Sequence, residues 1–190
     1  MVARIAGCLA IGLVLAAGDL PAQAVAFRLS AVDMFGGAVL PAESDPGVAF
    51  GARVGLLDLF ARSVQAGLEF EWWTAERQDA ELEVRDIVFG LTFLSELSRT
   101  GPLRPYLGLN AALHSVDTSR PGGERFLDGE PAAAERISGY RAGGGVVAGL
   151  ALRLTRTGAI WLLVEYRYTA VARVAHHELR GGARLLTARR

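Results

Sequence analysis

The sequence is short of cysteine, of long hydrophobic runs and of net charge, and each shortage excludes a class of protein. Cys8 is the only cysteine among the 190 residues, so residues 9–190 contain no disulfide, thiol nucleophile or cysteine metal ligand. No hydrophobic run approaches the ~20 residues that a transmembrane helix requires. With 20 basic and 20 acidic residues the formal charge is zero, which argues against a general nucleic-acid-binding protein.

Residues 1–24 have the pattern of a secretory signal peptide. Arg4 supplies the positive charge, residues 5–17 form the hydrophobic core, and Ala22-Gln23-Ala24 is a small-x-small cleavage motif. A retained membrane anchor is the alternative, but the hydrophobic core is short against the ~20 residues that span a bilayer. Cys8 precedes this core, which argues against a lipoprotein. We expect an exported chain with one domain over residues 25–190.

Eight segments of that domain alternate hydrophobic residues with polar or small ones, which is the two-residue period of a β-strand. In one of them, Leu68 and Phe70 alternate with Glu69 and Glu71. A helical stripe repeats every 3.6 residues and does not give strict alternation over this length. The eight segments are approximately residues 25–35, 48–57, 64–73, 84–93, 103–114, 139–154, 160–169 and 178–187.

An even number of alternating segments of ~10 residues is the sequence signature of a transmembrane β-barrel. We therefore predict an all-β fold, an eight-stranded antiparallel up-and-down transmembrane β-barrel. The connections support this prediction, because such barrels alternate short periplasmic turns with longer outer loops. We expect long connections at residues 36–47, 74–83 and 115–138 and short ones at 58–63, 98–102 and 155–159, with both termini in the periplasm. The connection at about 170–177 is shorter than its position suggests.

Three motifs resemble those of the small eight-stranded outer-membrane barrels, the OmpA-like and OmpX-like proteins. They are Pro105-Tyr106-Leu107-Gly108-Leu109-Asn110, Val164-Glu165-Tyr166-Arg167-Tyr168 and Gly181-Gly182-Ala183-Arg184-Leu185. The resemblance implies a monomer in the bacterial outer membrane that contacts lipid and lipopolysaccharide and is inserted by the barrel assembly machinery. One feature departs from the group, since the chain ends in Leu185-Leu186-Thr187-Ala188-Arg189-Arg190 without a terminal aromatic residue.

Charged residues on the inward side of the predicted strands are the main candidate site. The interior of an eight-stranded barrel is just wide enough for side chains to fill, so these charges must pair, because isolated buried charge is costly. We interpret them as a structural ion network, with an ion path or a small-molecule site as the alternative. The residues are Arg28, Arg53, Glu69, Glu71, Asp86, Arg104, Arg141, Arg153, Glu165, Arg167, Glu178, Arg180 and Arg184.

Aromatic residues near the strand ends are expected at the membrane interface, where amphipathic rings are enriched. They are Trp72, Trp73, Phe93, Tyr166 and Tyr168. Core packing in a soluble barrel is the alternative. In that inverted barrel the hydrophobic faces would point inward and form a lipocalin-like cavity for a small apolar ligand.

Other functions have weaker support. Lipid A hydrolases and acyltransferases of this architecture suggest His114, Ser115 and Asp117 as candidate catalytic residues, but neighbouring strand residues face opposite sides, so we predict no enzyme. His176 and His177 could bind a metal, but two neighbouring histidines without a third ligand are more often exposed polar residues, and we predict no metal or cofactor. The connection 115–138 is rich in charge, glycine and proline and could bind a surface ligand.

Overall fold

A computed structural model of the chain describes residues 29–42, 44–59, 64–77, 82–98, 100–119, 138–172 and 174–187. The predicted signal peptide and Arg28 lie outside these residues. Eight strands make up the described part: β1 (Ala31–Pro41), β2 (Gly47–Leu59), β3 (Val64–Arg77), β4 (Leu82–Glu96), β5 (Leu103–Ser119), β6 (Gly139–Arg153), β7 (Ile160–Val171) and β8 (His176–Leu186). Among these residues no helix is long and hydrophobic enough to cross a bilayer.

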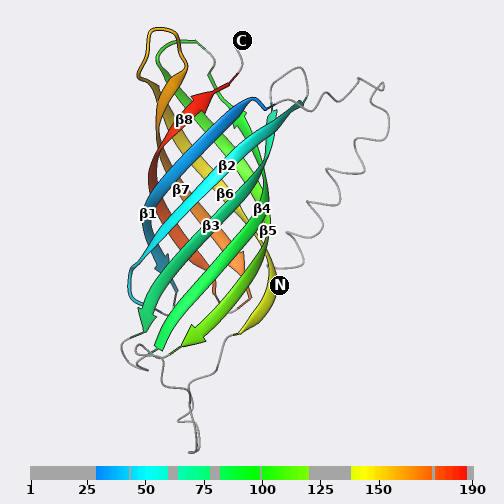
Figure 1. Ribbon diagram of the computed structural model, residues 1–190, viewed down its shortest axis with the longest axis vertical. Coiled ribbons are helices and arrows are strands. Elements are labelled where there is room, and N and C mark those ends of the chain that lie inside the picture. Colours follow the sequence, from blue (N-terminus) through cyan, green and yellow to red (C-terminus); the bar gives the residue numbers. More distant parts are fainter. Residues whose placement is uncertain are drawn as a thin grey trace, which may run out of the picture.

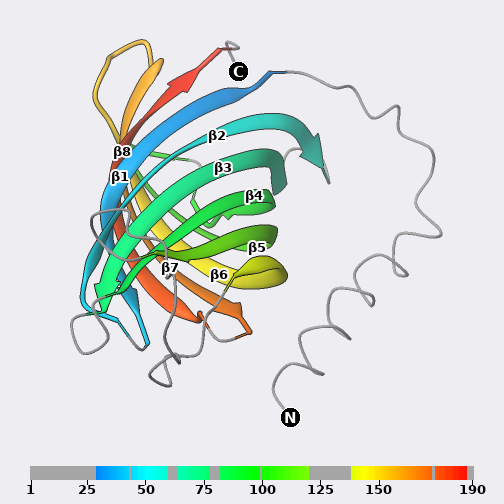
Figure 2. The same cartoon turned by 60° about the horizontal axis from the view of Figure 1, so that its bottom comes forward.

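Each strand pairs antiparallel with its neighbours in the sequence, and β1 pairs with β8, which closes the barrel (Figures 1 and 2). The predicted eight-stranded antiparallel up-and-down barrel is therefore confirmed. We call the end where Thr187 donates to the Ser30 carbonyl the terminal end. The strands β1, β3, β5 and β7 run from it to the opposite end, which we call the far end. The terminal end is at the top of Figure 1.

Strand β7 shows how the sequence pattern becomes two faces. Its residues alternate without interruption between exposed and buried, beginning with exposed Ile160 and buried Trp161. Hydrophobic side chains such as Val164 and Tyr166 cover the outside, whereas Glu165 and Arg167 are buried inside. The lipocalin-like alternative is wrong, because it requires the hydrophobic face inside the barrel.

Strand β1 differs from its predicted position and phase. The expected segment was 25–35 with Ala31 outward, but the strand begins at Ala31, whose side chain is only 1% exposed. Gly36 and Gly37 were assigned to a loop and lie in the strand instead. A Cβ atom on Gly37 would be 2.1 Å from the Leu179 carbonyl oxygen of β8, so the close approach of these two strands requires glycine here.

The predicted alternation of long and short connections is also wrong in part. Residues 42–46 join β1 to β2, and 78–81 join β3 to β4, so both connections are short. The reason is that polar residues assigned to loops continue the strands: Thr74 pairs with Arg85 and Glu76 with Glu83. Only the connection between β5 and β6 stays long, from 120 to 138.

The interior is arranged in layers, with hydrophobic clusters at both ends. The far-end cluster consists of Val39, Ala49, Trp73, Ala75, Val84, Val88, Val116, Val171 and Val174. The terminal-end cluster consists of Leu94, Tyr106, Val147, Ala151, Trp161 and Leu163. Charged residues fill the interior between them. Hydrophobic side chains thus separate the buried charges from both openings.

Candidate functional site

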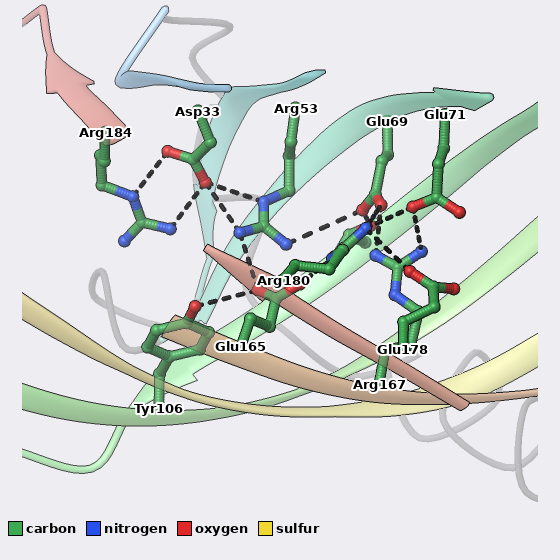
Figure 3. Close-up of polar contacts among 11 residues, drawn as sticks. Asp33, Arg53, Glu69, Glu71, Tyr106, Glu165, Arg167, Glu178, Arg180 and Arg184 are labelled. Carbon is green, nitrogen blue, oxygen red and sulfur yellow. Dashed lines mark hydrogen bonds and ion pairs between the residues drawn. The ribbon is translucent and has the colours of Figure 1, made fainter. Parts of the chain in front are cut away.

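Most of the predicted ion network is buried inside the barrel, and all of these residues except Asp86 form one connected group (Figure 3). The residues that the structure brings inside are Arg53, Glu69, Glu71, Asp86, Glu165, Arg167, Glu178, Arg180 and Arg184. Their strands place them there because every second residue of a strand points inward. They come from five different strands, so the network joins the barrel wall across its interior.

The part of the network nearer the terminal end is organised around Asp33. Arg184 Nε donates to Asp33 Oδ1 at 2.7 Å, and Arg53 Nε donates to Asp33 Oδ2 at 2.9 Å. Arg53 also donates from Nη2 to Glu165 Oε2 at 3.0 Å, and the Tyr106 hydroxyl donates to the same oxygen at 2.9 Å. Charge-assisted bonds of this kind are the stronger class of protein hydrogen bond.

The central part is organised around Glu69 and Arg180. Arg180 Nη1 donates to Glu69 Oε1 at 3.0 Å and also to Glu71, and its Nη2 donates to Glu165. Arg167 donates to Glu69 as well, and the Thr92 hydroxyl donates to Glu69 Oε2 at 2.7 Å. Each carboxylate therefore has at least one guanidinium partner, which is the condition for burying such charges.

Asp33 is a member of the network that the sequence prediction missed. It was missed because the first strand was predicted as the segment 25–35 with Ala31 outward, and in that phase Asp33 also points outward, whereas both are buried in β1. Asp33 alternates with outward Met34, which is 68% exposed. Taking Met34 as outward would have set the phase of this strand correctly and placed Asp33 inside.

The remaining predicted network residues lie elsewhere. Arg104 is near the terminal end, where it pairs with Glu96 at 3.3 Å and stacks 4.5 Å from the centre of the Trp161 ring. Arg141 is partly exposed near the far end. Arg153 was predicted inside but is exposed, because β6 ends there and the barrel wall no longer covers it. Arg28 is outside the described residues.

The predicted interface aromatics divide into two groups. Phe93, Tyr166 and Tyr168 are exposed on the outer face, and Trp72 is partly exposed beside Phe50. Trp73 was also expected outside, but it is fully buried in the far-end cluster. The physical reason is that adjacent strand residues point to opposite faces, so Trp72 and Trp73 cannot both be outward.

A second polar group contains two histidines at the far-end side of the network. His114 Nδ1 lies 2.6 Å from Asp86 Oδ2, and His176 Nε2 lies 2.9 Å from Glu178 Oε1. The two rings are in edge contact with 6.2 Å between their centres. Glu71 is close to His176 and Glu178, with candidate ligand atoms of all three within 4.8 Å of one another. Glu71 and Glu178 are inward residues predicted from the sequence, but their meeting with His176 was not.

The candidate catalytic residues do not meet. His114 is buried inside, whereas Ser115 lies on the outer face between Ile87 and Tyr140 of the neighbouring strands. Asp117 is exposed. His177 is also on the outer face, where its ring contacts Tyr166 and Tyr168. His176 and His177 therefore cannot serve one site together.

Comparison with known proteins supports the fold. No protein-family model matches the sequence, and a comparison with curated proteins found no significant match. Among solved structures, Neisserial surface protein A aligns with a TM-score of 0.60 at 17% identity, covering 82% of this chain and 96% of that one. The N-terminal β-barrel domain of Pseudomonas aeruginosa OprF aligns with a TM-score of 0.52 at 12% identity, covering 83% and 97%. The resemblance to small eight-stranded outer-membrane barrels is thus confirmed as a likeness of fold.

Proposed function

We propose that this protein is an integral barrel of the bacterial outer membrane with a filled interior, acting as an envelope structural or surface-interaction protein. One observation carries the proposal: a hydrophobic exterior surrounds a charged interior. Every strand contributes exposed large hydrophobic side chains, such as Met34, Phe50, Phe89 and Leu109. Soluble monomers rarely expose hydrophobic patches beyond a few hundred Å². Lipid is the solvent that such a surface fits.

The closed barrel also satisfies the second requirement of a membrane protein. In a bilayer every backbone N–H and C=O group must bond within the protein, and a closed sheet has no unpaired edge. Here β1 and β8 pair over the whole of β1, from Ala31 to Pro41. The two outer-membrane proteins of similar fold support the location.

The interior supports a structural role in preference to a wide pore. Arg180, Arg167 and Arg53 reach across the interior to the carboxylates of other strands, and hydrophobic clusters lie on both sides of them. In planar bilayers we expect no large, steady conductance. A water-filled pore that stays open would contradict the filled interior.

Two measurements test the location. Cells that express the full chain are separated into inner- and outer-membrane fractions on a density gradient, and the extracted protein is run on gels with and without boiling. We expect recovery with the outer membrane, resistance to extraction by urea, and a mobility that changes on heating, as stable transmembrane barrels show. Recovery in the soluble fraction would overturn the proposal.

The connection 120–138 separates the two candidate roles. It joins β5 to β6 at the far end, and its residues 120–137 lie outside the described residues. Replacing it with a short turn leaves all eight strands in place. Loss of cell attachment with unchanged heat-dependent mobility would favour surface interaction. An envelope structural role would be favoured if the variant without this connection attaches normally and if cells become sensitive to detergent only when the whole gene is deleted.

A further inference from the structure

The hydrogen bonds of His176 define which of its ring nitrogens carries a proton. Its Nδ1 lies 2.9 Å from the carbonyl oxygen of Val174. A carbonyl oxygen only accepts, so Nδ1 is the donor. In the neutral ring Nε2 then has a lone pair, and it faces Glu178 Oε1 at 2.9 Å. Two acceptors at this distance repel unless a proton or a metal cation lies between them.

Glu71 completes a three-sided group around that position. Ligand atoms of Glu71, His176 and Glu178 all lie within 4.8 Å of one another, and all three residues are buried. Glu71 Oε2 accepts from Arg180, but its Oε1 is buried and has no hydrogen-bond partner among the described residues. An unsatisfied buried carboxylate oxygen costs free energy, so this atom requires a partner that the described residues do not supply.

The buried charges also do not balance. The fully buried carboxylates are those of Asp33, Glu69, Glu71, Asp86, Glu165 and Glu178, whereas the fully buried guanidinium groups are those of Arg53, Arg167, Arg180 and Arg184. With neutral histidines this leaves two negative charges in excess. Arg141 is partly exposed and pairs in register with His114, on the other side of the histidine contact. One divalent cation would supply the missing charge inside.

We propose that Glu71, His176 and Glu178 bind one divalent cation of the kind that takes mixed nitrogen and oxygen ligands, with Zn²⁺ as the best fit. The surroundings match a built metal site. Metal-binding histidines usually donate their second ring nitrogen to a backbone carbonyl, as His176 does to Val174. Arg180 bonds the other oxygen of Glu71, which leaves Oε1 without a partner among the described residues and able to bind a cation.

The position of the site suggests its role and its kinetics. Trp73 packs against the His176 ring with 5.1 Å between centres, and the far-end cluster covers the site. A cation there would join β3 to β8 across the interior. Because no exposed side chain takes part, we expect the metal to enter during folding and to exchange slowly afterwards.

The test uses the whole barrel refolded in detergent with Zn²⁺ or with a chelator, followed by removal of free metal. Folding is checked by heat-dependent mobility, and bound zinc is measured by mass spectrometry. We expect one zinc per wild-type chain and at least a tenfold loss in His176→Ala and Glu71→Gln. The matched controls are His177→Ala, which removes the neighbouring histidine on the outer face, and His114→Asn, which removes the other buried one. Both should keep their zinc.

Cobalt provides a second measurement that does not depend on stability. Co²⁺ bound by one histidine and two carboxylates absorbs visible light. This absorption should appear in the wild type and be absent from Glu71→Gln. The comparison of these two proteins remains valid even if His176→Ala fails to fold. Folded wild-type protein that retains no zinc would overturn the proposal and leave a protonated histidine as the neutralising group. Equal zinc in wild type and Glu71→Gln would overturn it too.

Discussion

Replacing Arg53 by methionine should destabilise the barrel strongly, because it removes a buried charge that pairs with carboxylates of three other strands, β1, β3 and β7. Arg53 contacts Asp33 at 2.8 Å and Glu165 at 3.0 Å, and its side chain is 3% exposed. Methionine keeps much of the length and hydrophobic volume but none of the charge. The loss therefore reports on the ion network more than on packing.

The expected loss of stability follows from the bonds that Asp33 and Glu165 keep when Arg53 is replaced. Asp33 keeps both of its bonds to Arg184, and Glu165 keeps Arg180 and the Tyr106 hydroxyl. Neither carboxylate loses every partner. We therefore expect a loss of about 3 kcal/mol in the free energy of unfolding, near the lower end of what breaking a buried ion pair costs.

The assay is urea unfolding in lipid vesicles, under conditions where unfolding and refolding curves coincide. Tryptophan fluorescence reports the transition, since the chain has 3 tryptophans and none is substituted. Arg85→Met is the matched control: Arg85 pairs with Glu83 at 2.6 Å, but its side chain is 54% exposed. Exposed pairs contribute below about 1 kcal/mol.

Arg53→Lys separates charge from geometry. Lysine keeps the positive charge but lacks the forked donors that reach Asp33 and Glu165 together, so its stability should fall between those of the wild type and Arg53→Met. Equal losses for Arg53→Met and Arg85→Met would refute the reasoning. That result would mean that water reaches the interior and screens its charges.

Three further predictions test other parts of the structure by urea unfolding in vesicles, with the remaining tryptophans as the reporter where one is replaced. Phe89→Arg places a charge on the outer face and should cost about 2–4 kcal/mol in a bilayer, whereas an unchanged stability would argue that this face does not meet lipid. Trp73→Ala should lower the free energy of unfolding by roughly 3–5 kcal/mol, because it leaves a cavity in the far-end cluster. Trp72→Ala should lower it clearly less. The order of the two losses would reverse if Trp73 faced outward. Gly149→Val should weaken the terminal-end cluster, since a Cβ there would lie 2.3 Å from the Tyr106 ring, and wild-type stability would show that the ring can move aside.

Alternation along the sequence determined which residues face in and which face out for most of the barrel. It placed Glu165 and Arg167 inside and Val164 and Tyr166 outside without any knowledge of their partners. Local alternation is sufficient for this, because successive strand residues always point to opposite faces. It failed where small residues interrupted the contrast, at Gly36 and Gly37, and one strand was therefore placed too early.

Only the tertiary structure decided which inward residues meet. Strand tilt and stagger set the level at which each side chain enters the interior, and these depend on pairing along the whole barrel. Thus Asp33 joins Arg53 and Arg184, Trp73 covers the far end, and Glu71 from β3 meets His176 and Glu178 from β8. No local pattern connects residues so far apart in the chain. The sequence determined the two faces, and closure of the barrel determined the contacts inside it.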